Sequence, residues 1–166
     1  MRGLTRRNAM KPQSTQNVQA HSALASLAVQ PLRRPATQRT VAITYGTYDL
    51  IHVGHVRLWQ RIKERFDVLI VAVSTDEFNA IKGKRSAVPY ADRVEMVLAC
   101  RYVDQVIPEQ TWEQKAHDIA QHNVDAFVMG SDWEGRFDEL KPLCEVVYLP
   151  RTEGISSTEI KTTIRG

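Results

Sequence analysis

The fold of this chain is decided between residues 41 and 62, which read VAITYGTYDLIHVGHVRLWQRI. The apolar run at the start of this stretch predicts a strand, and the spacing of apolar residues at its end predicts an amphipathic helix. The turn between them carries the run His52–His55, in which two histidines flank Gly54. Because helix N-termini present free backbone N–H groups and attract anions, this turn predicts a phosphate site and nucleotide chemistry.

The composition is that of an ordinary globular protein. The chain has 166 residues, of which 43% are hydrophobic and 25% are charged, enough for one domain with a substantial core. No apolar run approaches the roughly 20 residues that a membrane-spanning helix requires. We therefore expect a cytoplasmic protein without a membrane span.

The positive charge of the chain is concentrated near its N-terminus. Residues 1–39 hold seven of the 22 Lys and Arg residues and no Asp or Glu, which leaves 15 basic and 19 acidic residues in 40–166. A mildly acidic domain is not expected to bind nucleic acid. The polar, proline-interrupted residues 1–39 predict a basic, disordered N-terminal extension. An organellar transit peptide, or a tail that binds nucleic acid or a membrane surface, is the alternative.

Strands and helices alternate from residue 40 onward. Strands are expected at 40–45, 67–74, 103–107, 124–129 and 145–149, and helices at 53–65, 91–100, 112–122, 137–143 and 156–164. A polar, basic loop is expected over 80–89. Alternation with nearly continuous apolar strands predicts an α/β fold: a Rossmann-like, doubly wound parallel sheet of about five strands, forming a single domain over 40–166.

Polar and charged segments follow four of the five predicted strands. Ligands of such sheets bind outside the carboxyl ends of the strands, near the point where the strand order reverses. We therefore expect four segments to meet at one edge of the sheet: His52 and His55, Thr75 to Lys82, Gly130 to Asp132, and Arg151 to Thr158.

The two histidines and the glycine suit a phosphate that undergoes displacement. Gly54 lets a phosphate approach the backbone without a Cβ in the way. His52 and His55 can each donate an N–H to oxygens on which negative charge builds up. Taken alone, the motif leaves two alternatives open, a pair of metal ligands or a structural helix cap.

Basic residues in the other segments extend this anion site. Arg151 offers a planar bidentate donor, and the serines at 156 and 157 can cap a helix whose N-terminus forms a second anion site. The run Lys82–Arg85 can close on phosphates as a cationic loop, although such a run is also typical of a solvated surface loop. Lys115 lies at a helix start, where it opposes the helix dipole and so favours a functional role.

Asp49 and Asp132 are the acidic candidates at the same edge of the predicted sheet. Either carboxylate could hold Mg²⁺ or bind a hydroxyl group, and Asp132 could equally cap a turn. Neither the Ser-His-Asp pattern nor a phosphate-binding lysine loop of the Walker type is evident, so covalent catalysis has no candidate nucleophile.

These motifs resemble those of the cytidylyltransferase family, within the HxGH nucleotidyltransferase superfamily. The resemblance extends from Thr40 to Ile164 and rests on the runs 45–49, 52–55, 74–79, 101–104, 112–115, 132–135 and 151–158. The first and last motifs are common to the superfamily. The run Trp112-Glu113-Gln114-Lys115 resembles the motif that is specific to the glycerol-phosphate branch of the family, of the teichoic-acid type.

The resemblance implies a reaction and its partners. CTP and sn-glycerol 3-phosphate would give CDP-glycerol and pyrophosphate by direct in-line attack on the α-phosphorus, for teichoic acid or another cell-surface polymer. Mg²⁺ or another divalent cation would accompany CTP, and the protein would be a homodimer.

The resemblance also implies roles by position. CTP would be contacted by Thr47, Tyr48, His52, Gly54, His55, Arg101, Asp132, Arg151, Thr152, Glu153, Gly154, Ile155, Ser156, Ser157 and Thr158. The acceptor would be contacted by Asp49, Lys82 and Lys115, and catalysis would fall to His52, His55, Lys82 and Arg151, with no residue assigned to a metal. The chain departs from the pattern at Tyr48, where Phe is usual, and at Ser131, where the related pattern has Asp.

Other functions would use part of the same pattern. Choline, ethanolamine or sugar phosphate could replace glycerol phosphate, and ATP could replace CTP. A catalytically silent nucleotide-binding regulator could keep the same phosphate contacts. Nucleic-acid binding through residues 1–39 would be a third function, and it would depend on salt concentration.

Overall fold

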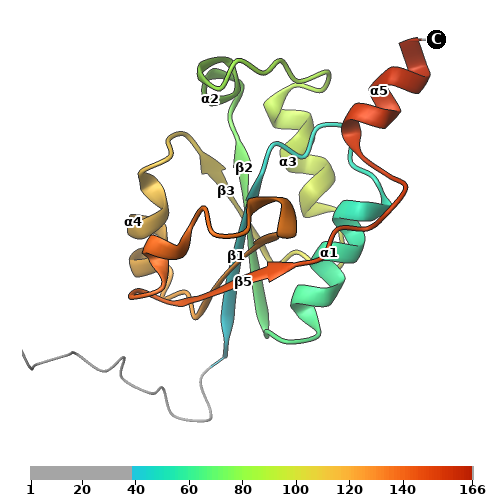
Figure 1. Ribbon diagram of the computed structural model, residues 1–166. Helices are drawn as coiled ribbons and strands as arrows, with labels where there is room; N and C mark the ends of the chain where they lie inside the picture. The colour runs from blue at the N-terminus through green and yellow to red at the C-terminus, as the bar shows by residue number, and fades with distance from the viewer. Residues whose placement is uncertain (1–38, 166) are drawn as a thin grey trace, which may run out of the picture. The chain divides into compact units, whose positions relative to one another are not determined.

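The computed structural model describes residues 39–165, so nearly all of the predicted N-terminal extension lies outside the described residues. The described chain forms a single five-stranded parallel sheet flanked by helices, which confirms the predicted α/β class (Figure 1). The strands are β1 Val41–Gly46, β2 Val68–Ser74, β3 Gln105–Glu109, β4 Ala126–Gly130 and β5 Glu145–Leu149, in the order β3-β2-β1-β4-β5. The order therefore reverses between β1 and β4.

Helices cover both faces of the sheet. They are α1 Val53–Lys63, α2 Asp76–Ile81, α3 Tyr90–Leu98, α4 Gln114–Gln121 and α5 Ser157–Arg165, with 3₁₀ turns η1 Ser131–Trp133 and η2 Asp138–Leu140. In Figure 1, α1 and α3 lie on one side of the sheet and α4 lies on the other. None of the helices in residues 39–165 has the length and apolar character that a membrane span requires.

Three local features differ from the sequence predictions. Helix α2 was not expected; it begins after Thr75, whose hydroxyl accepts a hydrogen bond from the Phe78 N–H at 3.2 Å. The helix expected at 137–143 is only the short 3₁₀ turn η2. The strand expected at 103–107 is β3 at Gln105–Glu109, so Pro108 lies inside it, which is tolerated because β3 is an edge strand.

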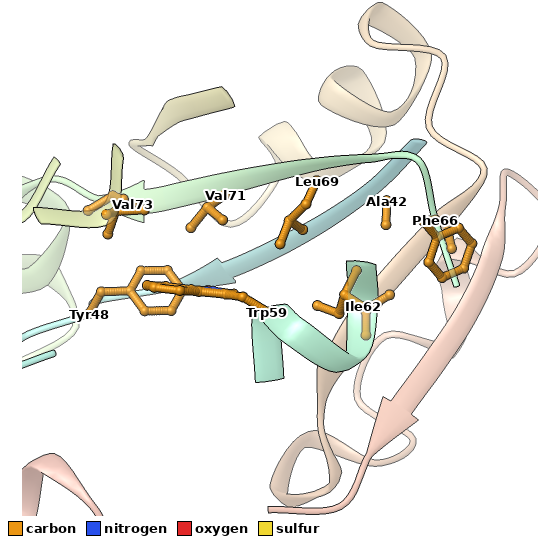
Figure 2. Packing of buried hydrophobic residues seen from close by; sticks show 11 residues of the cluster. Ala42, Tyr48, Trp59, Ile62, Phe66, Leu69, Val71 and Val73 are labelled. Carbon is orange, nitrogen blue, oxygen red and sulfur yellow. The ribbon is translucent and has the colours of Figure 1, made fainter. Parts of the chain in front are cut away.

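Alternate residues of the central strands pack into two separate hydrophobic cores, one on each face of the sheet. Leu69, Val71 and Val73 of β2 point towards Trp59 and Ile62 of α1, as Figure 2 shows. The residues between them pack on the opposite face against Ile119 of α4, Phe137 and Leu140. Both faces of the strands are therefore buried, which is the reason that their sequences read as continuous apolar runs.

The core on the α1 side contains polar atoms without a well-formed hydrogen bond. Within the described residues, these buried atoms are Thr44 Oγ1, Tyr48 OH and Trp59 Nε1, and Thr44 and Trp59 are only weak hydrogen-bonding neighbours of the Tyr48 hydroxyl. The Tyr48 and Trp59 rings are in contact, with centroids 5.2 Å apart (Figure 2). Burying a hydroxyl without a well-formed hydrogen bond costs free energy, so the Tyr48 hydroxyl contributes little to the stability of the fold.

We expect opposite results when two buried tyrosines lose their hydroxyls. Tyr48→Phe should leave the free energy of unfolding unchanged or raise it by up to about 1 kcal/mol, because it removes an unpaired polar group. Tyr45→Phe should lower it by about 1–2 kcal/mol, because the Tyr45 hydroxyl donates to Asp118 at 2.8 Å in the core. Urea unfolding of both variants measures the difference, and an equal loss in both would contradict this account.

Candidate functional site

A cavity of about 620 Å³ lies at the carboxyl ends of the strands, where the order reverses. Most of the predicted site residues line it: Thr47, Tyr48, Asp49, His52, Gly54, His55, Lys82, Lys115, Asp132, Arg151, Thr152, Ile155, Ser156, Ser157 and Thr158. The segments after β1, β2, β4 and β5 are therefore brought together, as the strand pattern predicted.

Three predicted site residues do not line this cavity: Arg101, Glu153 and Gly154. Arg101 is exposed after the end of α3, and its guanidinium lies 5.4 Å from the centroid of the Tyr102 ring. Arg101 precedes β3 in the chain, so it lies at the end of the sheet away from the cavity.

Other lining residues were not assigned a role from the sequence. They are chiefly Arg61, Glu109, Trp112, Trp133 and Lys161. Glu109 is the last residue of β3, so its place at a strand end was a signal available in the sequence. Arg61 and Lys161 lie inside helices, and no pattern in the sequence distinguishes them from solvated surface residues.

His52 and His55 cap α1 with the same nitrogen atom of each ring. Nδ1 of His52 accepts a hydrogen bond from the Gly54 N–H at 3.1 Å, and Nδ1 of His55 accepts one from the His52 N–H at 3.4 Å. A neutral imidazole whose Nδ1 accepts carries its proton on Nε2. Both rings therefore offer an Nε2–H donor at the cavity, and their centroids are 3.9 Å apart in a stacked arrangement.

Burial keeps both histidines neutral at physiological pH. Burial, reinforced by neighbouring His52, lowers the pKa of His55 to about 4. Burial and the positive charge of Arg151 also lower the pKa of His52. Neither ring is therefore an imidazolium near pH 7, and the two donate hydrogen bonds as neutral groups.

Gly54 is needed by the histidine pair itself. A Cβ at this position would lie 2.8 Å from Cε1 of the His52 ring and 3.3 Å from Cγ2 of Ile155. Contacts this short would displace the ring from the cavity wall. The glycine therefore makes room for the His52 side chain as well as for a ligand that approaches the helix N-terminus.

Arg93 holds the loops that surround the cavity. Its side chain is fully buried, and it donates to the carbonyl oxygens of Thr47 at 2.6 Å, Ser74 at 2.8 Å and Val88 at 3.0 Å. Its remaining partner is the Asp76 carboxylate at 2.6 Å. The ends of β1 and β2 and the basic loop before α3 are thus tied to one side chain.

The Asp49 carboxylate is occupied by protein groups. It accepts hydrogen bonds from the N–H groups of Ala87 and Val88 at 2.9 and 3.0 Å, and it pairs with Lys161 of α5 at 2.6 Å. Burial alone would raise the pKa of Asp49, but the bonds from Lys161, Ala87 and Val88 together bring this pKa below its ordinary value. Asp49 therefore joins the basic loop and α5, with little capacity left for a substrate.

A buried charge cluster lines the cavity at the carboxyl ends of β2 and β3. Lys115 Nζ lies 2.9 Å from Oε1 of Glu109, and Lys82 Nζ lies 3.6 Å from Oε2 of the same carboxylate. Ser74 donates its hydroxyl to Glu109 and accepts from Lys82 at 2.8 Å. Burial lowers the pKa of Lys82, although the charge of Glu109 opposes that shift.

The side chains around the cavity do not fit a metal held by the protein. Asp49 and Glu109 are engaged by protein donors, and Asp132 is the remaining lining carboxylate. Residues 39–165 contain no group of three or more His, Cys, Asp or Glu side chains arranged to hold a metal ion. Any divalent cation would therefore depend on phosphate oxygens of a bound nucleotide for its ligands.

The fold and the site define an α/β enzyme that binds nucleotide phosphates: a reversed strand order, a helix N-terminus with two N–H donors, and surrounding cations. Residues 43–163 match the family model described as Cytidylyltransferase-like. The chain belongs to this family.

Two curated relatives cover nearly the whole folded region. The glycerol-3-phosphate cytidylyltransferase of Bacillus subtilis (strain 168) is 60% identical over 124 residues, which are 75% of this chain and 96% of that protein. The protein of the same name from Staphylococcus aureus is 59% identical over 124 residues, with 75% and 94% covered.

A solved structure supports the fold alone. The lipopolysaccharide core biosynthesis protein from Thermoplasma volcanium superposes with a TM-score of 0.60 at 17% identity, covering 70% of this chain and all of that protein.

The depressed histidine pKa values predict a pH-dependent stability. The pKa of His55 is about 4 when folded, against about 6.5 when unfolded, so the unfolded chain binds the proton more readily. The free energy of unfolding should therefore fall as the pH is lowered from about 6.5 towards 4. Urea unfolding across this range measures it.

The matched variants are His55→Gln, which should flatten this dependence, and His117→Gln, which should not, because His117 is exposed on α4. An NMR titration of wild-type His55 near pH 6.5 would rule out the neutral ring.

Proposed function

We propose that this chain transfers a cytidylyl group from CTP to sn-glycerol 3-phosphate, forming CDP-glycerol and pyrophosphate. The observation that carries the proposal is the identity with glycerol-3-phosphate cytidylyltransferases over nearly their entire length. The cavity supports it, since two histidine donors and a set of cations line one space. Cytidylyltransferases for choline, ethanolamine or sugar phosphates are less favoured, because the glycerol-phosphate relatives match so closely.

The proposed reaction is direct in-line attack. An oxygen of the acceptor phosphate forms a bond to the α-phosphorus of CTP as the bond to pyrophosphate breaks. The attacking phosphate is already ionised at neutral pH, so no side chain needs to remove a proton. Catalysis then consists of positioning the two substrates and stabilising charge on the transferring group.

The histidine pair is assigned to the α-phosphate. Its two Nε2–H donors are fixed before substrate arrives, because Nδ1 of each ring is held by a backbone N–H. Donors that need no reorientation stabilise the developing charge most effectively. Neutral rings also avoid binding the ground-state triphosphate as tightly as two imidazolium groups would.

Other lining residues are assigned to the remaining phosphates. Arg151, Thr152 and the N-terminus of α5, with Ser156 to Thr158, would hold the leaving pyrophosphate. Lys82 would hold the acceptor phosphate, and Lys115 would contact another part of the same acceptor. Arg101 is left out of this assignment, since it does not line the cavity.

Several finer points stay predictions. Mg²⁺ would enter with the phosphates of CTP, and we assign no side chain to it. A homodimer, a cytoplasmic location and a product destined for teichoic acid or another surface polymer are all untested expectations of the family resemblance.

One assay tests the proposal against its rivals. Wild-type protein is incubated with CTP, Mg²⁺ and sn-glycerol 3-phosphate, and CDP-glycerol is measured by chromatography and ³¹P NMR. Parallel reactions replace CTP with ATP, or glycerol phosphate with choline, ethanolamine or sugar phosphate. CDP-glycerol as the preferred product is the expected result. CTP binding without turnover of any acceptor would instead support a silent regulator.

His55→Ala should reduce kcat by about 10²–10³-fold, the usual loss when one donor to the transition state is removed. The KM for CTP should change less, because other groups also bind the triphosphate. His117→Ala is the matched control, since this histidine is exposed on α4. Because His55 also caps α1, thermal unfolding is measured alongside. A folded His55→Ala variant with near-normal kcat would overturn the assignment.

A further inference from the structure

The ammonium group of Lys115 lies in an unusual setting. Its side chain is only 5% exposed, and Nζ lies 2.9 Å from Oε1 of Glu109. Three aromatic rings surround the same nitrogen, with centroids 4.6 Å away for Tyr45, 4.8 Å for Trp112 and 5.7 Å for Phe137. We call these three rings and the Glu109 carboxylate the ammonium cage.

The ammonium cage has the chemistry by which proteins hold cationic ligands. A cation within about 6 Å of an aromatic centroid is attracted by the electrons of the ring face, and cages of several rings recognise quaternary ammonium groups. A carboxylate adds charge complementarity. In this chain the cage adjoins the proposed acceptor site, because Tyr45, Glu109, Trp112, Lys115 and Phe137 all line the same cavity.

We infer that Lys115 is a specificity-determining residue, because its ammonium group fills the ammonium cage and denies it to the cationic head of an acceptor such as choline phosphate or ethanolamine phosphate. The inference rests on the proposed function, which makes this cavity the site of a phospho-alcohol. An acceptor with a neutral polyol does not compete for the cage. A cationic acceptor would clash with the Lys115 side chain and would be repelled by Lys82 and Lys115. The site would therefore discriminate against cationic acceptors.

Removing the Lys115 ammonium group does not leave the Glu109 carboxylate without a partner. Glu109 retains Lys82 at 3.6 Å and the Ser74 hydroxyl when Lys115 is replaced. Lys82 itself lies over the Phe78 ring, 4.2 Å from its centroid, and is farther, at 5.6 Å, from the centroid of the cage ring Trp112. Replacing Lys115 by alanine therefore removes one cation and its stem, and leaves the rings and the carboxylate in place.

Tetramethylammonium is the probe, because it carries the cationic head without a phosphate. Its affinity is measured by calorimetry at constant ionic strength for the wild type, Lys115→Ala, Lys115→Met and the double variant Lys115→Ala with Glu109→Gln. Lys115→Ala should bind it at least roughly tenfold more tightly than the wild type. Lys115→Met, which keeps the cage filled without the charge, should not gain affinity, and the double variant should lose most of the gain.

A folded Lys115→Ala variant that binds tetramethylammonium no better than Lys115→Met would overturn the inference. If Lys115→Ala does not fold, the wild type decides: choline phosphate should fail to compete with glycerol 3-phosphate, and competition at similar concentrations would overturn the inference. The calorimetric test needs no turnover. A gain in ammonium binding by Lys115→Ala, together with no CDP-glycerol formation by the wild type, would therefore reject the proposed function and still support the cage.

Discussion

Arg93 is fully buried, and its guanidinium donates hydrogen bonds to the carbonyl oxygens of Thr47 and Ser74, where the chain leaves β1 and β2. A parallel sheet brings the carboxyl ends of its strands to one edge but does not fix the loops that leave them. Arginine remains charged in proteins and carries its donors in a rigid fork. Its burial is therefore tolerable only when these loops are in place, which makes the cavity wall and the fold one cooperative unit.

Three of the lysines that line the cavity are already paired with carboxylates of the protein. Glu109 contacts both Lys82 and Lys115, and Asp49 pairs with Lys161 of α5. These contacts hold the lysines at defined positions before any phosphate arrives. In the proposed reaction, such preorganisation spares the reorientation that would otherwise accompany phosphate binding, and it gives the acidic side chains of the cavity a role.

The fold and the meeting of four segments at one cavity could be predicted from the sequence, because buried parallel strands leave a strong apolar signal and these segments follow strand ends. Helix α2 was missed since its six residues are too few for a visible period. The partner of each carboxylate could not be predicted either: Asp49 meets Lys161 across more than one hundred residues, a pairing that no local pattern encodes. Arg101 shows that a motif can match a family without its side chain reaching the cavity of the same chain.

The two histidines that offer donors to a ligand are also the residues that begin α1, because each ring accepts a backbone N–H at the helix start. The histidine pair therefore couples the stability of the first helical turn to the shape of the cavity. Fraying of α1 at its start would move both Nε2 atoms at the same time.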